Sequence, residues 1–295
     1  MPELPEVETV VRDLRPLLIG RKFTGIQVGK HKLRCPWSRS WNSSIIGQSV
    51  DAIARRGKWI LIDLGEPRLV VHLGMTGQFT VTAADRTRES HTHLVFKLDD
   101  GNELRFRDVR RFGSVRMLSN RATLEEFLAS IRLGPEPFDL DAETWRLALS
   151  RTNRNLKAIL LDQTIAAGIG NIYADESLFE ARLHPALLGR QIMPKQANTL
   201  RRAIVTVLTR AIDKRGSSIR DYVGGDGLKG EMQHEFRVYG RTGEPCLRCR
   251  SKIVRITLAG RSTHFCPRCQ RPGRRQCSAI SDRIGVCRKL AAILC

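Results

Sequence analysis

The stretch Cys246-Leu247-Arg248-Cys249, followed after residues 250–265 by Cys266-Pro267-Arg268-Cys269, decides the fold of the end of the chain. Between the two pairs, residues 253–258 and 261–265 have strand composition and Ala259-Gly260 supplies a turn. Two Cys-x-x-Cys pairs on such a hairpin close a tetrahedral site. We therefore expect one structural zinc ion, with no coordination position left for a substrate. The predicted ligands are Cys246, Cys249, Cys266 and Cys269.

The alternative for these cysteines is a pair of short disulfide loops, and the expected compartment disfavours it. The chain has no apolar run of roughly 18 residues that would span a bilayer. Its N-terminus carries Glu3, Glu6 and Glu8, where a signal peptide would be basic. We predict a cytoplasmic protein, whose thiols stay reduced. The remaining cysteines, among them Cys277, Cys287 and Cys295, show no ordered spacing.

The charge balance predicts a polyanionic partner. The 295 residues include 50 Lys and Arg against 30 Asp and Glu, a net charge of +20. Such a field attracts nucleic acid, although charge alone does not separate a DNA enzyme from a ribosomal or membrane-surface protein. A hydrophobic content of 41% in a chain of this length favours a folded protein of more than one domain.

Periodicity divides the rest of the chain into a β-rich and a helical part. Residues 5–18 have the apolar spacing of an amphipathic helix, and short runs within residues 23–118 predict a β-sandwich or barrel. The prolines of residues 134–138 interrupt the pattern, and helical periodicity follows over residues 142–215. There, a glycine turn at residues 167–170 separates predicted helices at 156–163 and 171–181, and such a helix, turns and helix unit presents backbone N–H groups to a phosphate.

The expected architecture is a multidomain α+β protein. It has an N-terminal helix with a β-sandwich (residues 1–134), a helix-two-turns-helix domain (135–235), a zinc-finger β-hairpin (236–270) and a basic C-terminal extension (271–295) of undetermined order.

Pro2 is a candidate nucleophile. Methionine before the small residue proline is normally removed, which exposes a secondary amine. An α-amine titrates near ~8 and lysine near ~10.4, so a terminal amine is partly unprotonated at neutral pH. Glu3 stands beside it. The alternative is an ordinary proline that precedes a helix.

Collinear motifs carry a resemblance to a known family. They are Met1-Pro2-Glu3-Leu4-Pro5-Glu6-Val7-Glu8-Thr9, Arg56-Gly57-Lys58, His72-Leu73-Gly74-Met75, Arg110-Arg111-Phe112-Gly113, Ala167-Gly168-Ile169-Gly170-Asn171-Ile172-Tyr173-Ala174 and the four spaced cysteines. In this order they resemble the bacterial formamidopyrimidine-DNA glycosylases of the Fpg/Nei family, from the N-terminus to Cys269. The sister enzyme, endonuclease VIII, usually has glycine where this chain has Leu4.

The resemblance implies a bifunctional DNA glycosylase and lyase. It would act on double-stranded DNA that contains oxidised purines, such as 8-oxoguanine and formamidopyrimidines, or abasic sites. Pro2 would form a Schiff base with the lesion sugar, Glu3 would move protons there, and strand cleavage would follow by β,δ-elimination. Such an enzyme needs zinc only for structure and is expected to act as a monomer without a membrane.

The resemblance also assigns roles to other residues. Lys58 and Arg261 would complete the catalytic set as phosphate contacts. DNA binding would involve His72, Arg111, Arg154 and Asn171. Met75, Arg110 and Phe112 would fill the space left by the flipped-out nucleotide. Glu6, Lys157 and Glu176 would lie beside the lesion pocket. Lys157 has an alternative reading as an exposed helix charge.

Three departures from the family pattern limit this transfer. Val109 replaces a usual proline, Glu231-Met232 replaces a commoner aromatic-containing pair in the base-capping loop, and residues 271–295 extend past the usual end. Because Glu231-Met232 lies where base choice is expected, a glycosylase for oxidised pyrimidines stays open as an alternative. A zinc-containing DNA-binding protein without catalysis is the other.

Overall fold

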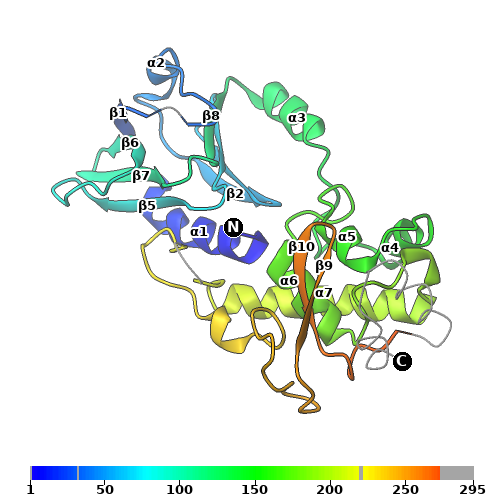
Figure 1. Cartoon of the computed structure of the whole chain (residues 1–295). Helices are drawn as coiled ribbons and strands as arrows, with labels where there is room; N and C mark the ends of the chain where they lie inside the picture. Colours follow the sequence, from blue (N-terminus) through cyan, green and yellow to red (C-terminus); the bar gives the residue numbers. More distant parts are fainter. Residues whose placement is uncertain (1, 32, 219–221, 273–295) are drawn as a thin grey trace. The chain divides into compact units, whose positions relative to one another are not determined.

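The computed structural model describes residues 2–31, 33–218 and 222–272 (Figure 1). The described residues divide into two compact units. The first unit consists of Met1–Arg132 and Ala211–Gln233, and the second of Leu133–Arg210 and His234–Cys295. Residues 273–295, with Cys277, Cys287 and Cys295 of the predicted basic extension, lie outside the described residues.

The first unit opens with helix α1 (Leu4–Leu18), close to the predicted 5–18. Val7, Val10 and Leu14 follow helical spacing and are 0% exposed. The helix contacts β2 (Ala52–Arg56), β3 (Trp59–Asp63) and β5 (Gly77–Ala83) of the sheets (Figure 1). The amphipathic pattern of the sequence therefore serves to bury one face of α1 against strands.

Two four-stranded antiparallel sheets form the body of this unit. One has the order β1-β6-β7-β5 and the other β2-β3-β4-β8. The strands not yet given are β1 (Phe23–Val28), β4 (Arg68–His72), β6 (Thr92–Leu98), β7 (Asn102–Asp108) and β8 (Ser114–Leu118). Apolar side chains of both sheets and of α1 share one core, which includes Ile60, Val71, Phe79, Phe96 and Phe106. The predicted sandwich is confirmed.

Two helices in this unit were not predicted. Helix α2 (Trp41–Ile45) interrupts the strand region, and α3 (Arg121–Ser130) follows β8. Helix α3 begins with the side chain of Asn120, which accepts a hydrogen bond from the backbone N–H of Thr123 at 2.9 Å. Leu124, Phe127 and Leu128 lie at helical spacing on the half-buried face of α3, a signal that the sequence analysis missed.

By its contacts the described part of the segment Ala211–Gln233 groups with the first unit, and the predicted domain boundary at residue 235 stays a prediction. The segment contacts α1: the backbone N–H of Ser217 donates to Glu6 Oε1 at 2.8 Å and Tyr222 Oη donates to Glu6 O at 3.1 Å. Hydrogen bonds between residues so far apart in the chain leave no trace in local composition, so periodicity does not indicate these contacts.

The second unit is built from helices and one hairpin. Its helices are α4 (Ala142–Ser150), α5 (Leu156–Leu161), α6 (Asn171–Glu180), the short η1 (Gly189–Gln191) and α7 (Pro194–Asp213). The last residues of α7 belong to the first unit. The short helix η2 (Met232–Glu235) spans the point at which the chain re-enters the second unit. The side chain of Gln163 holds the turn between α5 and α6, because it accepts from Gly168 N at 2.9 Å and donates to Ile169 O at 2.8 Å. Strands β9 (Val254–Leu258) and β10 (Arg261–Phe265) form the predicted hairpin. Within the described part of the chain, no helix combines the length and hydropathy needed to cross a bilayer.

A buried histidine makes the second unit sensitive to acid. His184 is 0% exposed, its Nδ1 accepts a hydrogen bond from Ala186 N at 3.2 Å, and its ring centroid lies 4.6 Å from that of Phe265. Burial lowers its pKa to about 4, because the apolar surroundings disfavour the imidazolium. The unfolded chain therefore binds a proton at this residue between pH 6.5 and 4 that the folded unit does not.

We expect the second unit to lose about 2–3 kcal/mol of stability between pH 7 and pH 4.5 through His184. The folded pKa is depressed, so this stability is complete above the unfolded value near ~6.5 and falls as the pH approaches 4. Urea unfolding, followed by Trp145 with the other tryptophans replaced by phenylalanine, measures the loss. His184→Asn keeps an acceptor without a titrating ring and should flatten the dependence, whereas His234→Asn, at an exposed position, should not. An equally steep loss in His184→Asn would disprove the assignment.

Candidate functional site

Pro2 and Glu3 are held by the first turn of α1. Both are buried, and Glu3 is the N-cap residue, 2% exposed. The backbone N–H of Glu3 donates to Glu6 Oε2 at 2.8 Å, which forms a capping box with the Glu3 side chain. The nitrogen of Pro2 therefore precedes a rigid helix start and not a mobile tail.

Glu6 is shared between this turn and the segment Ala211–Gln233. Its Oε1 accepts hydrogen bonds from the backbone N–H of Ser217 at 2.8 Å and from Ser217 Oγ at 3.1 Å. The carboxylate is 1% exposed, so these donors replace its water. Glu6 thus ties a segment distant in sequence to the residue next to Pro2. Its predicted place beside the lesion pocket stays a prediction.

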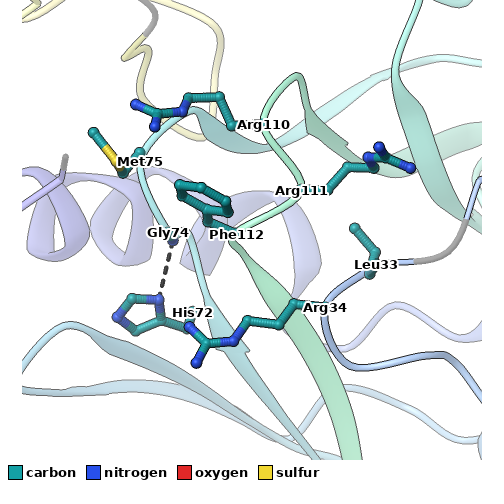
Figure 2. A pocket seen from close by; sticks show the side chains of 8 residues that line it. All are labelled: Leu33, Arg34, His72, Gly74, Met75, Arg110, Arg111 and Phe112. Atoms are coloured by element: carbon teal, nitrogen blue, oxygen red, sulfur yellow. Dashed lines mark hydrogen bonds between the residues drawn. The ribbon is translucent and has the colours of Figure 1, made fainter.

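Lys58 lies close enough to His72 for its positive charge to act on the imidazole ring. Lys58, 8% exposed, follows Gly57, whose φ of 57° makes the turn between β2 and β3. His72 ends β4, and its Nδ1 accepts from the backbone N–H of Gly74 at 3.0 Å (Figure 2). Burial first, and then the positive charges of Lys58 and Arg34, lower the pKa of His72 to about 4. At neutral pH the ring is uncharged, and because Nδ1 accepts, Nε2 carries the proton and is a donor.

The three predicted void-filling residues meet at one pocket. It has a volume of about 570 Å³ and is lined by Leu33, Arg34, His72, Gly74, Met75, Arg110, Arg111 and Phe112 (Figure 2). Met75 is 37% exposed and Phe112 45%, so neither serves the core. The guanidinium carbon of Arg110 lies 4.7 Å from the centroid of the Phe112 ring. Arg111 adopts a left-handed backbone with φ 57° beside them.

Asp108 organises this pocket, and the sequence analysis missed it. Its carboxylate is 0% exposed and accepts from the backbone N–H of Gly113 at 2.7 Å and of Arg110 at 3.2 Å. The hydroxyl of Thr76 also donates to it, so one side chain binds the loop after β4 and the loop after β7. The sequence offered an aspartate directly before Val109-Arg110-Arg111 as the only signal, because its burial and its partner Thr76, distant in the chain, become visible only in the structure.

Two glycines allow these loops to touch. Gly74 has φ 63°, and a Cβ there would stand 2.5 Å from Gly113 N. At Gly113 a Cβ would stand 2.7 Å from the Phe106 ring. The backbones that carry Met75 and Phe112 are thus in direct contact, which fixes the separation of the two side chains.

In the second unit, Asn171 and Arg261 are neighbours. Asn171 Nδ2 donates to the backbone oxygen of Ser262 at 3.0 Å, and its Oδ1 is buried without a hydrogen-bond partner among the described residues. Arg261 is exposed and follows the tight turn Ala259-Gly260, whose φ angles are 49° and 68°. The start of α6 and the hairpin tip are joined at this point.

Arg154, in contrast, is tied to the helix that follows it, α5, and to the residue at the end of that helix, Asp162. Its Nη1 donates to Asp162 Oδ2 at 2.6 Å and its Nη2 to Ala158 O at 2.8 Å, with the side chain 46% exposed. The structure does not bring it to Asn171 by any hydrogen bond described here, and its DNA-binding role stays a prediction.

Lys157 is not an exposed helix charge, which corrects one alternative of the sequence analysis. It is 0% exposed, and its Nζ donates to Asp175 Oδ1 at 2.6 Å and to Asn171 O at 2.8 Å. Asp175 Oδ2 accepts from His264 N at 2.8 Å and approaches His264 Nδ1 at 3.1 Å. The pair therefore connects α5, α6 and β10. Its location beside the lesion pocket stays a prediction.

Glu176 binds backbone and not solvent. It is 3% exposed and accepts from the N–H groups of Arg237, Val238 and Tyr239 at 2.9, 2.9 and 2.8 Å. Burial raises its pKa, although the three donors act in the opposite direction. Glu176 orders the chain that leads into the cysteine hairpin, and its predicted pocket role is likewise untested.

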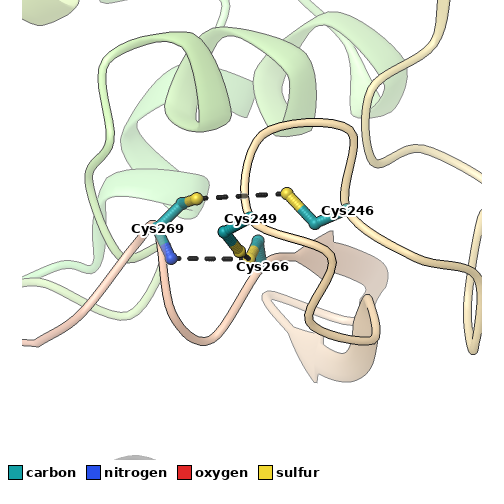
Figure 3. Close-up of side chains that lie close together, drawn as sticks. All are labelled: Cys246, Cys249, Cys266 and Cys269. Carbon is teal, nitrogen blue, oxygen red and sulfur yellow. Dashed lines mark hydrogen bonds between the residues drawn. The ribbon is translucent and has the colours of Figure 1, made fainter.

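The four spaced cysteines form the metal site. Their Sγ atoms lie within 4.8 Å of one another, the Cys249–Cys266 and Cys246–Cys269 pairs at 3.4 and 3.9 Å (Figure 3). Ligands at ~2.3 Å from a tetrahedral zinc stand about 3.8 Å apart, so the set fits the ion. Backbone N–H groups of Arg248 and Cys269 point at Cys246 and Cys266 sulfurs, both at 3.4 Å. The chain holds one structural zinc here.

Glu231 and Met232 lie near the C-terminal end of the segment Ala211–Gln233. These are the residues at which the sequence suggested a departure from the family in base preference. Met232 is 2% exposed and its N–H donates to Gly216 O at 3.0 Å. Glu231 is exposed. Of the two, only Glu231 faces outward.

Three segments of the chain match domain families found in formamidopyrimidine-DNA glycosylases. Residues 1–115 match the formamidopyrimidine-DNA glycosylase N-terminal domain, 133–223 the H2TH domain of the same glycosylases, and 243–272 the zinc finger found in FPG and IleRS. A formamidopyrimidine-DNA glycosylase of Chloroflexus aurantiacus is 46% identical over 276 residues, 92% of this chain and 98% of its own length.

Solved structures agree with this match. A Lactococcus lactis FPG mutant in complex with a Fapy-dG containing DNA is 37% identical, with a TM-score of 0.86, and the Lactococcus lactis Fpg with an abasic site containing DNA is also 37% identical, with a TM-score of 0.85. Each alignment covers 92% of this chain and 100% of the other.

We expect the purified protein to hold one zinc ion per chain and Cys266→Ser to lose it, because the tetrahedral set then lacks a thiolate. Metal analysis after dialysis measures this. Losing the ion frees the hairpin, so affinity for DNA should also fall. Cys35→Ser, outside the cluster, is the matched control and should keep its zinc. A zinc-free wild-type protein would refute the site.

Proposed function

Because the chain belongs to the formamidopyrimidine-DNA glycosylase family, we propose that it excises oxidised purines from double-stranded DNA and cleaves the strand at the resulting abasic site. The observation that carries the proposal is the buried first turn of α1, which holds Pro2 beside Glu3 and Glu6. Once Met1 is removed, the Pro2 nitrogen is a secondary amine at a fixed position, and such an amine is an effective nucleophile near neutral pH.

The proposed reaction begins with attack of the Pro2 nitrogen on C1′ of the damaged nucleotide. The N–C1′ bond forms as the glycosidic bond breaks, and the base leaves with the bonding electrons and takes up a proton. The Pro2 nitrogen then passes its N–H proton to the Glu3 carboxylate, and its lone pair forms the C1′=N bond as the C1′–O4′ electrons move to oxygen. The Glu3 carboxyl delivers the proton to O4′, which leaves an opened sugar joined to Pro2 as a cationic iminium.

Strand cleavage follows from the iminium. Loss of a C2′ proton allows the 3′ phosphate to leave, and a second proton loss expels the 5′ phosphate. Water then hydrolyses the iminium and releases Pro2. These steps use protons and water alone. The zinc ion has a structural part, because four thiolates leave it no open position.

DNA binding is proposed to rest on two kinds of donor. Lys58 and Arg261 supply charge to phosphates, and Asn171 and the uncharged His72 supply directed N–H groups. Met75, Arg110 and Phe112 form an exposed apolar and cationic group suited to the gap left by a flipped nucleotide. We further propose that the protein acts as a monomer on the chromosome in the bacterial cytoplasm.

Borohydride trapping tests the nucleophile. Reduction of the iminium should join the protein to an oxidised-purine duplex covalently, and a version whose N-terminus is blocked by a retained Met1 or a tag should form no adduct. Denaturing gels measure the adduct. The blocked protein is its own control for folding, since its zinc content and its salt-dependent DNA binding should be unchanged.

Pro2→Gly keeps a terminal amine and should retain part of the trapping. If the blocked protein forms the adduct at the full rate, a lysine is the nucleophile and the mechanism is wrong. If the wild type forms none, the protein binds DNA without catalysis.

Phe112→Ala and Asp108→Asn should slow base excision much more than cleavage at a preformed abasic site. Phe112→Ala removes the side chain that fills the gap. Asp108→Asn puts an NH2 donor in place of one of the carboxylate oxygens that accept from the N–H groups of Gly113 and Arg110. We expect a loss of roughly tenfold or more in single-turnover excision. Asp99→Asn, on the same unit and exposed, is the matched control. Equal losses on the two substrates would argue against the wedge.

A further inference from the structure

Arg215 adopts a backbone conformation that its side chain makes unfavourable. Its φ is 58°, in the left-handed region, and it is followed by Gly216 with φ 70°. Glycine or asparagine occupies such positions at the end of a helix at lower cost. The contacts of the Arg215 guanidinium offset part of this backbone cost.

The guanidinium joins two carboxylates. Its Nη1 and Nη2 donate to Asp13 Oδ1 and Oδ2 at 2.9 and 3.0 Å, a two-point contact, and Nη2 also donates to Asp226 at 2.7 and 2.8 Å. The Asp13 side chain is 8% exposed and that of Arg215 36%. Planar bidentate pairing fixes direction as well as distance.

Asp13 also binds the chain around Asp226 directly. The backbone N–H of Gly225 donates to Asp13 Oδ2 at 3.0 Å, and a Cβ at Gly224 would stand 2.2 Å from the same oxygen. Gly225 O in turn accepts from Val81 N of β5 at 3.1 Å. Residues 224–226 are thus held between α1 and the edge of a sheet.

This second attachment complements the one at Glu6. Ser217 and Tyr222 connect the same segment to Glu6, and Glu6 receives the N–H of Glu3, next to Pro2. Asp13 and Glu6 lie on one helix, so α1 holds the segment at two places along its length. In the proposed reaction the damaged base is bonded to the C1′ that Pro2 attacks, which puts the groups beside Glu6 among those that can reach that base.

We propose that the Asp13–Arg215–Asp226 cluster is a positioning device for base excision: it holds residues 215–218 and 222–226 against α1 so that the groups beside Glu6 meet the damaged base. This inference rests on the proposed function. Its residues touch neither substrate nor the reacting atoms. It predicts a selective effect, because a preformed abasic site has no base to be positioned.

Arg215→Gly separates positioning from folding. Glycine relieves the left-handed backbone, so thermal stability should not fall in proportion to the lost ion pairs. We expect single-turnover excision of an oxidised purine to slow about tenfold, with abasic-site cleavage changed less than about twofold. Arg215→Lys, which keeps the charge without the two-point contact, should lie between. Asp13→Asn should resemble Arg215→Gly.

Arg182→Gly is the matched control, because Arg182 is an exposed arginine of the second unit with φ 57°. It should leave both rates unchanged. Equal slowing of excision and abasic-site cleavage in Arg215→Gly, or no slowing of either, would overturn the positioning role. In that case a wild type active on both substrates would still uphold the proposed function. A wild type without excision would overturn both proposals.

Discussion

A single buried carboxylate, that of Glu6, fixes the geometry on which the proposed chemistry depends. One of its oxygens accepts from the backbone of Glu3 and the other from the backbone and hydroxyl of Ser217. A carboxylate 1% exposed must be satisfied by protein donors, so the chain start and a segment more than two hundred residues later are held to the same two oxygens. The first turn of α1, which carries the proposed nucleophile, has little freedom as a result.

Buried acids play the same part elsewhere. Asp108 gathers the two loops of the void-filling residues, Asp175 joins Lys157 to His264, and Glu176 gathers the N–H groups of residues 237–239. Each is almost fully buried and each receives backbone donors. In a protein with a net charge of +20, these acidic residues lie inside the fold, where they order loops. The exposed surface is then more positive and attracts a polyanion.

Charge alone does not describe the donors that would meet DNA. His72 lies near Lys58 and Arg34, and these cations together with burial keep it neutral at physiological pH. Its Nε2–H is a directed donor without a charge. Lysine and arginine attract the DNA phosphates through charge. A neutral N–H donor such as that of His72 adds a directed hydrogen bond, which orients the phosphate rather than increasing the general affinity.

The sequence by itself determined the elements whose pattern is local. The spacing of the cysteines gave the zinc site, apolar alternation gave the two sheets, helical spacing gave α1, and collinear motifs gave the family, because each depends on residues near one another or on order along the chain. Helix α3 was missed although Leu124, Phe127 and Leu128 have helical spacing, since the run is short and its apolar face is only half-buried. The tertiary structure alone decided which residues are partners across long distances. Asp108 with Thr76, Lys157 with Asp175, and Arg215 with Asp13 pair through space, and contacts of this kind group the described part of residues 211–233 with the first unit. The apolar periodicity of a segment gives no information on such contacts. A buried charge is satisfied by the partner that the fold brings to it, however far away that partner lies in the chain.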